Sequence, residues 1–385
     1  MKRMICVVSA ALLLCGCESK TPYIPRETAS AAVSVGDYEY KESAISTSSG
    51  SLFQITSRGF QYMSGDVMPV YTPSRGKSYQ VCYDPLCSHG MGSDCFYQFM
   101  VYGSVAEQKG ERLYWYDHDV NLENPGKLVE NDMHYRICTT DLTGQDFEIL
   151  YRNSGNYISE IALGEDRIYF TEQIGDRLCV LHFVDYNGRN LKTQPYTEGE
   201  ELVVSAFACM GNEIYYIANG ILSVCDAELE NSRVLAEIGE APLYADARNE
   251  KLYYTRSDTV FCYDPAGDTT EVILSAEDGM VITGLCVTDA GIYYQKLPEN
   301  ITTASLYADY IACLEEGYSK LYRYDFATGE ITETAIPAGL YIFSYTVADD
   351  LVFGIRCHEN SHNRTVNGRG HFCWNTKTGE VTDVP

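Results

Sequence analysis

The densest group of potential metal ligands in the chain lies within fourteen residues. It comprises Cys82, Cys87, His89 and Cys95. Thiolates and neutral imidazoles are ligands of Zn²⁺, and three cysteines with one histidine form a known structural set. The composition of this cluster therefore indicates zinc as a candidate cofactor.

The spacing within the same cluster leaves other interpretations open. It lacks the Cys-x-x-Cys pair that zinc fingers and ribbons use, and residues 81–85 around Cys82 nearly repeat residues 261–265. Cys82 therefore fits an ordinary strand cysteine. Cys87 and Cys95 can then form a local disulfide, or all the thiols can stay reduced.

A second group, His358-Glu359-Asn360-Ser361-His362, matches the HExxH pattern of zinc proteases. That chemistry needs a helix, which places both imidazoles on one face and the glutamate beside the metal-bound water. Here the motif follows the apolar residues 351–357 and precedes a segment rich in Asn and Gly, which is loop composition. We interpret it as a surface loop in which His358 and His362 are candidate binding residues, able to hold an adventitious metal.

The sequence Asp117-x-Asp119-x-Asn121 resembles the start of a calcium loop. Leu122 replaces the glycine that an EF-hand requires and Leu128 replaces its distal glutamate, which excludes that motif. We predict a solvated acidic loop, with Asp117 and Asp119 as candidate ligand contacts.

A recurring apolar-tyrosine phrase identifies the elements that position these groups. It appears as Arg112-Leu113-Tyr114-Trp115, Arg167-Ile168-Tyr169-Phe170, Glu213-Ile214-Tyr215-Tyr216, Lys251-Leu252-Tyr253-Tyr254 and Gly291-Ile292-Tyr293-Tyr294. Several copies precede a second strand-like run that ends in Asp226, Asp264 or Asp325. Tyrosine, β-branched residues and glycine in this arrangement favour strands and turns.

The spacing of the phrase predicts the architecture. The second strands are marked by Phe60, Leu113, Ile168, Ile214, Leu252, Ile292 and Leu351, at intervals of 38 to 59 residues. Four-stranded units of this size that repeat along a chain are typical of a β-propeller. We predict an all-β fold, a single propeller over residues 51–385 with seven four-stranded blades, six or eight being the alternatives.

Long insertions are predicted between the second and third strands of three units, at residues 117–133, 296–319 and 358–370. Such connections all leave the same face of a propeller, and binding surfaces form where insertions collect. Residues 306–317 of the second insertion have helical spacing, and Tyr307 and Tyr310 within it are candidate contacts. The alternative is that the insertions are tolerated loops without a function.

The remaining cysteines follow the repeat. Predicted third strands hold Cys138, Cys225, Cys262 and Cys373, and predicted first strands hold Cys209 and Cys286. Cysteines at apolar strand positions behave as small buried hydrophobes. A dense disulfide framework is not expected, because neighbouring blades rarely bring such positions within bonding distance.

The N-terminus has the pattern of an export signal. Lys2 and Arg3 precede a short apolar run, which ends at Cys15-Gly16-Cys17. The run is too short to span a bilayer as a mature anchor. We predict a lipoprotein signal peptide at residues 1–16, lipidation of Cys17, a flexible tether over residues 17–50 and a location on the extracytoplasmic face of a bacterial membrane. The alternative is a plain secretory signal.

The charge excludes some partners. Loss of Lys2 and Arg3 with the signal changes the net charge from −26 to −28. Nucleic acids and anionic lipid surfaces both attract basic patches, so neither is an expected electrostatic partner. The membrane is expected to be a partner only through the lipid at Cys17.

The repeats resemble the YWTD/TolB-like group of propellers, most closely at Leu252-Tyr253-Tyr254-Thr255 and Ile168-Tyr169-Phe170-Thr171. With Cys17 and the loop that holds Cys82, Pro85, Cys87, His89 and Cys95, the chain resembles uncharacterised propeller lipoproteins of Gram-positive gut-type bacteria. In that group, a Cys-x-x-Pro-x-Cys-x-His…Cys loop ends the first blade. The resemblance implies a fold and no reaction.

Three functions remain open at this level. The first is a membrane-tethered module that binds a protein, peptide or glycan on the face with the insertions. The second is an extracellular hydrolase or lyase that uses carboxylates at the propeller mouth or the Cys/His loop, and the third is a scaffold subunit of a surface complex. The chain has neither a GxSxG nucleophile motif nor a phosphate-binding glycine loop. A pair of acids facing one pocket would favour the enzyme, and an exposed aromatic patch on the insertion face would favour binding.

Overall fold

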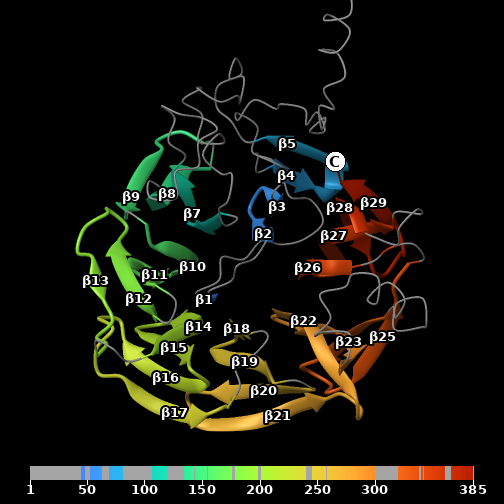
Figure 1. The fold of residues 1–385 in the computed structure, drawn as a ribbon. Coiled ribbons are helices and arrows are strands. Elements are labelled where there is room, and N and C mark those ends of the chain that lie inside the picture. Colours follow the sequence, from blue (N-terminus) through green and yellow to red (C-terminus); the bar gives the residue numbers. More distant parts are fainter. Residues whose placement is uncertain are drawn as a thin grey trace, which may run out of the picture.

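The computed structural model describes most of the region predicted to form the propeller. The described residues are 45–47, 53–62, 69–80, 106–119, 134–142, 144–153, 155–175, 178–197, 201–239, 245–256, 258–299, 320–337, 340, 342–359 and 366–384. They form antiparallel sheets arranged around a common centre (Figure 1).

Five of the sheets have four strands each, in sequence order. They are β2 (Phe53–Thr56), β3 (Gly59–Tyr62), β4 (Pro69–Thr72) and β5 (Lys77–Gln80); β6 (Glu107–Lys109), β7 (Arg112–Asp119), β8 (His134–Asp141) and β9 (Glu148–Arg152); β18 (Ala245–Arg248), β19 (Lys251–Arg256), β20 (Thr259–Asp264) and β21 (Thr269–Ser275); β22 (Met280–Thr288), β23 (Gly291–Pro298), β24 (Lys320–Asp325) and β25 (Ile331–Ala335); and β26 (Ile342–Ala348), β27 (Leu351–Glu359), β28 (Val366–Asn375) and β29 (Val381–Val384).

A sixth, nine-stranded sheet contains two antiparallel runs. The first is β10 (Tyr157–Leu163), β11 (Arg167–Gln173), β12 (Leu178–Asp185) and β13 (Lys192–Thr193), and the second is β14 (Leu202–Met210), β15 (Glu213–Ala218), β16 (Ile221–Asp226) and β17 (Arg233–Glu237). A short parallel contact between Leu178–Cys179 of β12 and Leu202–Val203 of β14 joins the runs. The ninth strand, β1 (Ile45–Thr47), pairs with β14.

The ring closes by side-chain packing between the first and last sheets. Strand β2 contacts β26 on one side and β6 on the other. The Phe60 and Phe353 rings stack at a centroid distance of 4.9 Å, and Phe53 meets Phe353 edge-on at 5.5 Å. The expectation of a propeller-like all-β ring is confirmed.

The recurring phrase explains why each second strand is buried on both faces. In β15, Ile214 and Tyr216 pack towards β11 and β12, whereas Tyr215 and Ile217 pack towards β19. Successive side chains of a strand point to opposite faces, so an unbroken apolar run fits a strand between two sheets. Each of the seven marker residues lies in the second strand of its antiparallel run.

The cysteine predictions are confirmed at all six repeat positions. The third strands β8, β16, β20 and β28 hold Cys138, Cys225, Cys262 and Cys373, and the first strands β14 and β22 hold Cys209 and Cys286. These six and Cys179 are free thiols. Burial raises the pKa of the Cys262 thiol to about 11, which keeps it protonated and unreactive.

All three predicted insertions begin later than expected because their flanking strands are longer. Residues 117–119 belong to β7, so the first connection is 120–133 instead of 117–133. Strand β23 extends to Pro298, so the second connection is 299–319 instead of 296–319. His358 and Glu359 belong to β27, and β28 begins at Val366, so the third is 360–365 instead of 358–370. The pairing of Glu359 with Val366 shows a hairpin, which the composition of the segment concealed.

Candidate binding face

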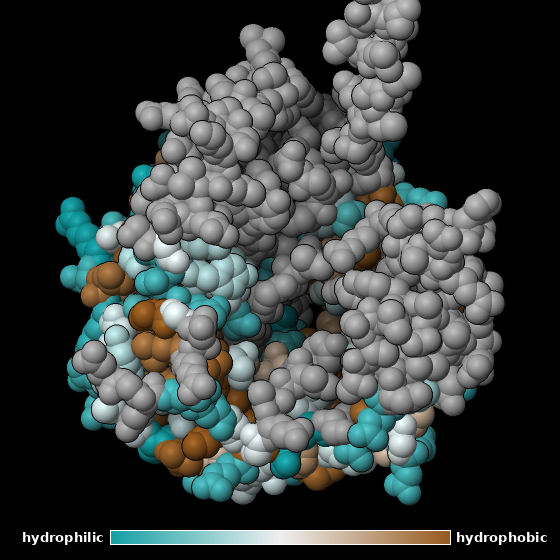
Figure 2. Space-filling model, in the orientation of Figure 1, coloured by the Kyte–Doolittle hydropathy of each residue, from teal (hydrophilic) through white to brown (hydrophobic). Residues whose placement is uncertain are grey.

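The two faces of the ring are formed by different connections. The hairpin face comprises the turns between first and second strands and between third and fourth strands. The insertion face comprises the connections between second and third strands, together with those that lead from one antiparallel run to the next. The described residues 155–156, 194–197 and 276–279 therefore lie on the insertion face, as do the ends of β7 and β23. Figure 2 shows a hollow at the centre of the ring, with small hydrophobic patches between hydrophilic ones around it.

A tyrosine pair with one exposed member lies on the insertion face, where β8 and β10 begin. Tyr157 begins β10 and keeps 42% of its surface exposed, whereas Tyr135 near the start of β8 is buried. Their rings meet edge-on, with centroids 5.2 Å apart. Tyr196, 44% exposed, lies in the connection between β13 and β14, on the same face. Tyrosine offers an apolar ring and a polar tip, which suits it to binding surfaces.

A turn of two asparagines fixes the position of this pair. The Asn153 side chain accepts a hydrogen bond from the Tyr135 backbone N–H at 3.2 Å and donates one to the Asn156 carbonyl at 2.9 Å. The Asn153 backbone N–H also donates to the Tyr135 carbonyl at 2.9 Å. The segment that carries Tyr157 is therefore tied to the strand that carries Tyr135.

A buried acidic residue, Glu172, binds the turn that precedes Tyr157. Glu172 of β11 accepts hydrogen bonds from the Asn156 side chain at 2.6 Å and from the Tyr151 hydroxyl at 2.7 Å. Burial, with Glu172 adding to it, raises the pKa of Tyr151 above its ordinary value, so the hydroxyl stays protonated as the donor. Glu172 is thus held by two neutral donors from the neighbouring sheet and its connection.

A histidine lies next to this carboxylate on the same face of the sheet. His182 of β12 stacks on Phe170 at 5.2 Å, its Nδ1 lies 2.9 Å from the Thr193 hydroxyl, and its buried Nε2 has no hydrogen-bond partner. Burial lowers the pKa of His182 against the opposing effect of Glu172. The imidazole is therefore held neutral within the sheet.

Strand β7 carries a buried ion pair on the face that points away from β11. Asp117 of β7 pairs with the Arg136 guanidinium of β8, and both side chains are almost fully buried. The Trp115 indole donates to the same carboxylate at 3.0 Å. Burial raises the pKa of Asp117 to about 6, and Arg136 and Trp115 oppose that rise. The prediction that Asp117 belongs to a solvated loop is wrong, because Asp117 lies inside a strand and is fully enclosed.

A lysine near the end of β23 is held in place by an ion pair. Lys296 of β23 is buried, and its ammonium pairs with Glu277 at 2.9 Å and lies 4.5 Å from the centre of the Tyr322 ring. Glu277 belongs to the segment that leads into β22. This ion pair thus ties β23 to the segment that connects β21 with β22.

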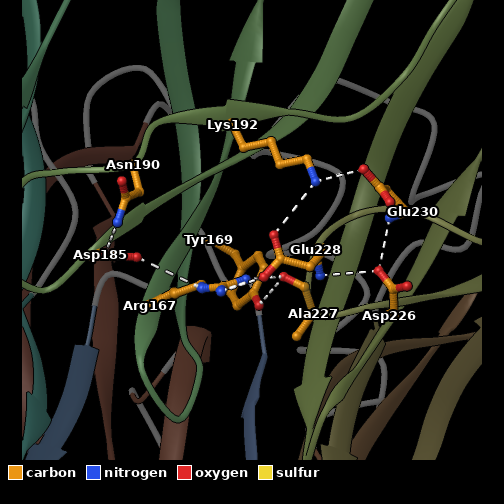
Figure 3. A network of polar contacts seen from close by, with 9 residues as sticks. All are labelled: Arg167, Tyr169, Asp185, Asn190, Lys192, Asp226, Ala227, Glu228 and Glu230. Atoms are coloured by element: carbon orange, nitrogen blue, oxygen red, sulfur yellow. Dashed lines mark hydrogen bonds and ion pairs between the residues drawn. The ribbon is translucent and has the colours of Figure 1, made fainter.

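The hairpin face carries a surface network between the two runs of the nine-stranded sheet (Figure 3). Arg167 pairs with Glu228 and donates to the Ala227 carbonyl at 2.7 Å. Lys192 reaches Glu230 at 2.7 Å and Glu228 at 3.4 Å. These contacts join β11 and β13 to the turn after β16. They hold neighbouring strands together.

Most predicted site residues fall outside the described part of the chain. Asp119 and His358 lie in strands β7 and β27, and their side chains are not described. The remainder, all outside the described residues, are Cys17, Cys82, Cys87, His89, Cys95, Tyr307, Tyr310 and His362. Within the described ranges, no group of three or more His, Cys, Asp or Glu side chains is arranged to hold a metal.

The residues that build the insertion face were not predicted individually. Tyr157 begins a first strand, after a polar turn, so it lies outside the recurring phrase that marks buried tyrosines. That difference in position was the available signal. Nothing in the sequence distinguishes Glu172, because an acidic residue in a predicted strand is expected to be exposed.

No family model and no curated protein matches the chain. Among solved structures, it is similar to an oligogalacturonate lyase from Vibrio parahaemolyticus, with 12% identity over 71% of this chain and 74% of that one and a TM-score of 0.46. A nidogen/laminin complex shows 11% identity over 66% and 89% of the two chains, with a TM-score of 0.38. An acylaminoacyl peptidase shows 11% identity over 74% and 46%, with a TM-score of 0.46. At these identities the similarity concerns the fold alone.

In the described ranges, no helix has both the length and the apolar character that a membrane crossing requires.

Proposed function

We propose that the protein is a seven-bladed propeller whose insertion face binds a protein, peptide or glycan outside the cytoplasm. The count of seven treats the two runs of the nine-stranded sheet as separate blades, since each has four antiparallel strands and only two residues of each run pair across the junction. The exposed Tyr157, supported from beneath by Tyr135, Asn153, Asn156 and Glu172, is the observation that carries the binding function.

The enzymatic alternative, a hydrolase or lyase, has less support among the described residues. Glycoside hydrolysis uses two carboxylates that flank one bond. Asp117 and Glu172 are the buried acids near the exposed tyrosine, and each is held by its own donors. They also lie on different sides of β7, because Tyr116 packs towards β11 and adjacent residues of a strand point oppositely. This pair therefore does not face one site.

The experiment is a binding screen of the purified protein against soluble oligosaccharides and unstructured peptides, followed by variants tested on the strongest ligand. Tyr157→Ala should weaken binding at least tenfold and lower the melting temperature only modestly, because 42% of the side chain's surface is exposed. Val234→Ala is the matched control, since Val234 is exposed on the outer strand β17. Equal affinities of the wild type and Tyr157→Ala for every ligand would remove Tyr157 from the site.

We also propose that the propeller is anchored at the extracytoplasmic side of a bacterial membrane through a lipid on Cys17. The support is the charged, apolar and Gly-Cys order of residues 1–17. Cys17→Ala should release the protein from the membrane fraction, which labelling with a radioactive fatty acid would check independently.

Zinc at Cys87, His89 and Cys95 remains a further proposal, supported by the ligand types. Metal analysis of protein purified without chelator should find about one equivalent, lost in Cys87→Ala. Stoichiometric free thiols without metal would contradict it.

A further inference from the structure

Strand β1 occupies the centre of the ring. Ile45, Ser46 and Thr47 pair antiparallel with Met210, Cys209 and Ala208 of β14, respectively. Strand β1 also contacts β10 and β18, the first strands on either side of β14. Figure 1 shows it inside the ring, on the side of β14 opposite β15. Strand β1 thus lies on the inner side of the ring.

The fold does not require this strand. The run β14–β17 already has the four strands of the other sheets, and the ring closes by the packing of β2 against β26. Of the first strands β2, β6, β10, β18, β22 and β26, none has a described strand on its central edge. Strand β1 is therefore an addition to one edge among several that are otherwise similar.

The edge that β1 uses is longer than β1 itself. Strand β14 has a register shift between Val204 and Ala206, and pairs without interruption with β15 from Ala206 to Met210. Strand β1 covers only Ala208 to Met210. An extended segment of five residues could therefore form more backbone hydrogen bonds along this edge than the three residues of β1 do.

We propose that the central edge of β14 is an acceptor for extended polypeptide, and that residues 45–47 are its resident, displaceable occupant. Strand addition to a free sheet edge draws its affinity from backbone hydrogen bonds. The short strand closes an edge that would otherwise attract other chains. Its release would open the centre of the ring to an extended segment of another protein. This inference is independent of the ligand proposed for Tyr157.

The first test uses the register to trap β1 in the full-length protein. Directly opposed residues of antiparallel strands have Cβ atoms about 4.5–5.5 Å apart, close to the separation that a disulfide needs. Ser46→Cys, oxidised with diamide, should therefore form an intramolecular disulfide with the native Cys209, identified by mass spectrometry of the digest. Thr47→Cys is the matched control, because position 47 faces Ala208. A missing link overturns the placement, and a disulfide between two copies would show that the occupant comes from a second molecule.

The second test asks whether β1 can be displaced. A fluorescent peptide with the sequence of residues 40–52 is added to full-length Ser46→Pro and Thr47→Pro, and its anisotropy is measured. Adjacent N–H groups of a strand point in opposite directions, so only one proline removes a hydrogen bond to β14 and the other serves as its control. We expect one variant to bind the peptide at least tenfold more tightly than the wild type, and the oxidised Ser46→Cys protein to bind none. Equal binding by the locked and unlocked proteins, or no binding by either proline variant when both remain folded by circular dichroism, overturns the proposal.

Discussion

The two faces of the ring are built by opposite rules. On the hairpin face, the turn after the third strand is repeated with the same chemistry: the side-chain oxygen of the last strand residue accepts hydrogen bonds from backbone N–H groups of the turn. This occurs at Asp141, Asp226, Asp264, Asp325 and Asn375. The acids predicted to end third strands, Asp226, Asp264 and Asp325, therefore each stabilise a turn.

The described connections of the insertion face have no such repeat. Its described connections hold an asparagine turn at 153–156, a lysine–glutamate pair at Lys296 and a close glycine contact at Gly220. Buried polar groups lie beneath it, whereas the ion pairs of the hairpin face are partly exposed. Residues repeated from sheet to sheet therefore maintain the ring. The departures from the repeat mark the face on which ligands are proposed to bind.

The largest expected effect separates the buried ion pair from the exposed ones. Arg136→Met leaves the Asp117 carboxylate buried without its partner, which should lower the free energy of unfolding by about 3–5 kcal/mol. Lys192→Met on the hairpin face should cause no change beyond experimental error, because its pairs are solvated. Urea unfolding of both variants measures the difference.

A double variant controls for lost packing at Arg136. Asp117→Asn combined with Arg136→Met removes both charges and keeps an acceptor for the Trp115 indole, so most of the lost stability should return. A double variant as unstable as Arg136→Met would mean that the side-chain volume of Arg136, and not its charge, is what the sheet requires.

The two faces should also respond oppositely to pH. The pKa of Asp117 is raised to about 6 from 3.8, so the folded state holds the proton more tightly and stability falls as the pH rises from about 4 to about 6. The size of the fall is about 3 kcal/mol by linkage. Hydrogen bonds from turn N–H groups lower the pKa of Asp226 and Asp325, so their contribution is complete above the unfolded pKa and is lost as the pH falls through the folded one.

Unfolding free energies at pH 4, 5, 6 and 7 for the wild type and Asp117→Asn isolate the first effect. The difference between the two proteins should change across this range and level off above pH 6. Parallel curves would show that Asp117 is ionised throughout.

The sequence predicted the parts of the fold that repeat and few of those that do not. Ile214 and Tyr215 identify a doubly buried strand because their pattern recurs in other second strands, and Asp226 identifies a turn for the same reason. Asp117 was placed in a solvated loop because its partner Arg136 is nineteen residues away, across a connection that conceals their pairing. Burial of a charge depends on such a partner, which spacing along the chain does not show.

Strand β1 was beyond prediction for a related reason. Ile45-Ser46-Thr47 has no distinctive pattern, and its pairing with β14 involves residues more than 160 positions away. A strand on the axis of a ring belongs to no repeat, so periodicity carries no information about it.

Two glycines test how tightly each face is built. On the insertion face, a Cβ on Gly220 would lie 1.6 Å from the Gly239 carbonyl oxygen, with φ at +74°. Gly211 on the hairpin face has φ at +60° and open space around it. Gly220→Ala should cost about 2–3 kcal/mol from overpacking and strain together, against about 1 kcal/mol of strain for Gly211→Ala.

Thermal unfolding of the two alanine variants measures this contrast. A third variant, Gly239→Ala, helps to locate the clash: its Cβ would meet only the Arg256 guanidinium, at 3.2 Å, a flexible group that can move. Gly239→Ala should therefore be milder than Gly220→Ala. Equal losses for Gly220→Ala and Gly211→Ala would show that the turn at Gly220 relaxes without cost.

The smallest effect concerns the repeated turn itself. Asp226→Ala removes the acceptor for the backbone N–H groups of Glu228 at 3.0 Å and Glu230 at 2.9 Å. Because these bonds are exposed to solvent, the loss should be about 0.5 kcal/mol. Asp226→Asn should restore the wild-type stability, since Asn375 already accepts the equivalent bonds from Lys377 and Thr378 at 3.0 Å each. If Asp226→Asn were as unstable as Asp226→Ala in urea unfolding, the turn would depend on the carboxylate charge near Lys192 instead of the hydrogen bonds, and the chemistry shared across the hairpin face would be electrostatic.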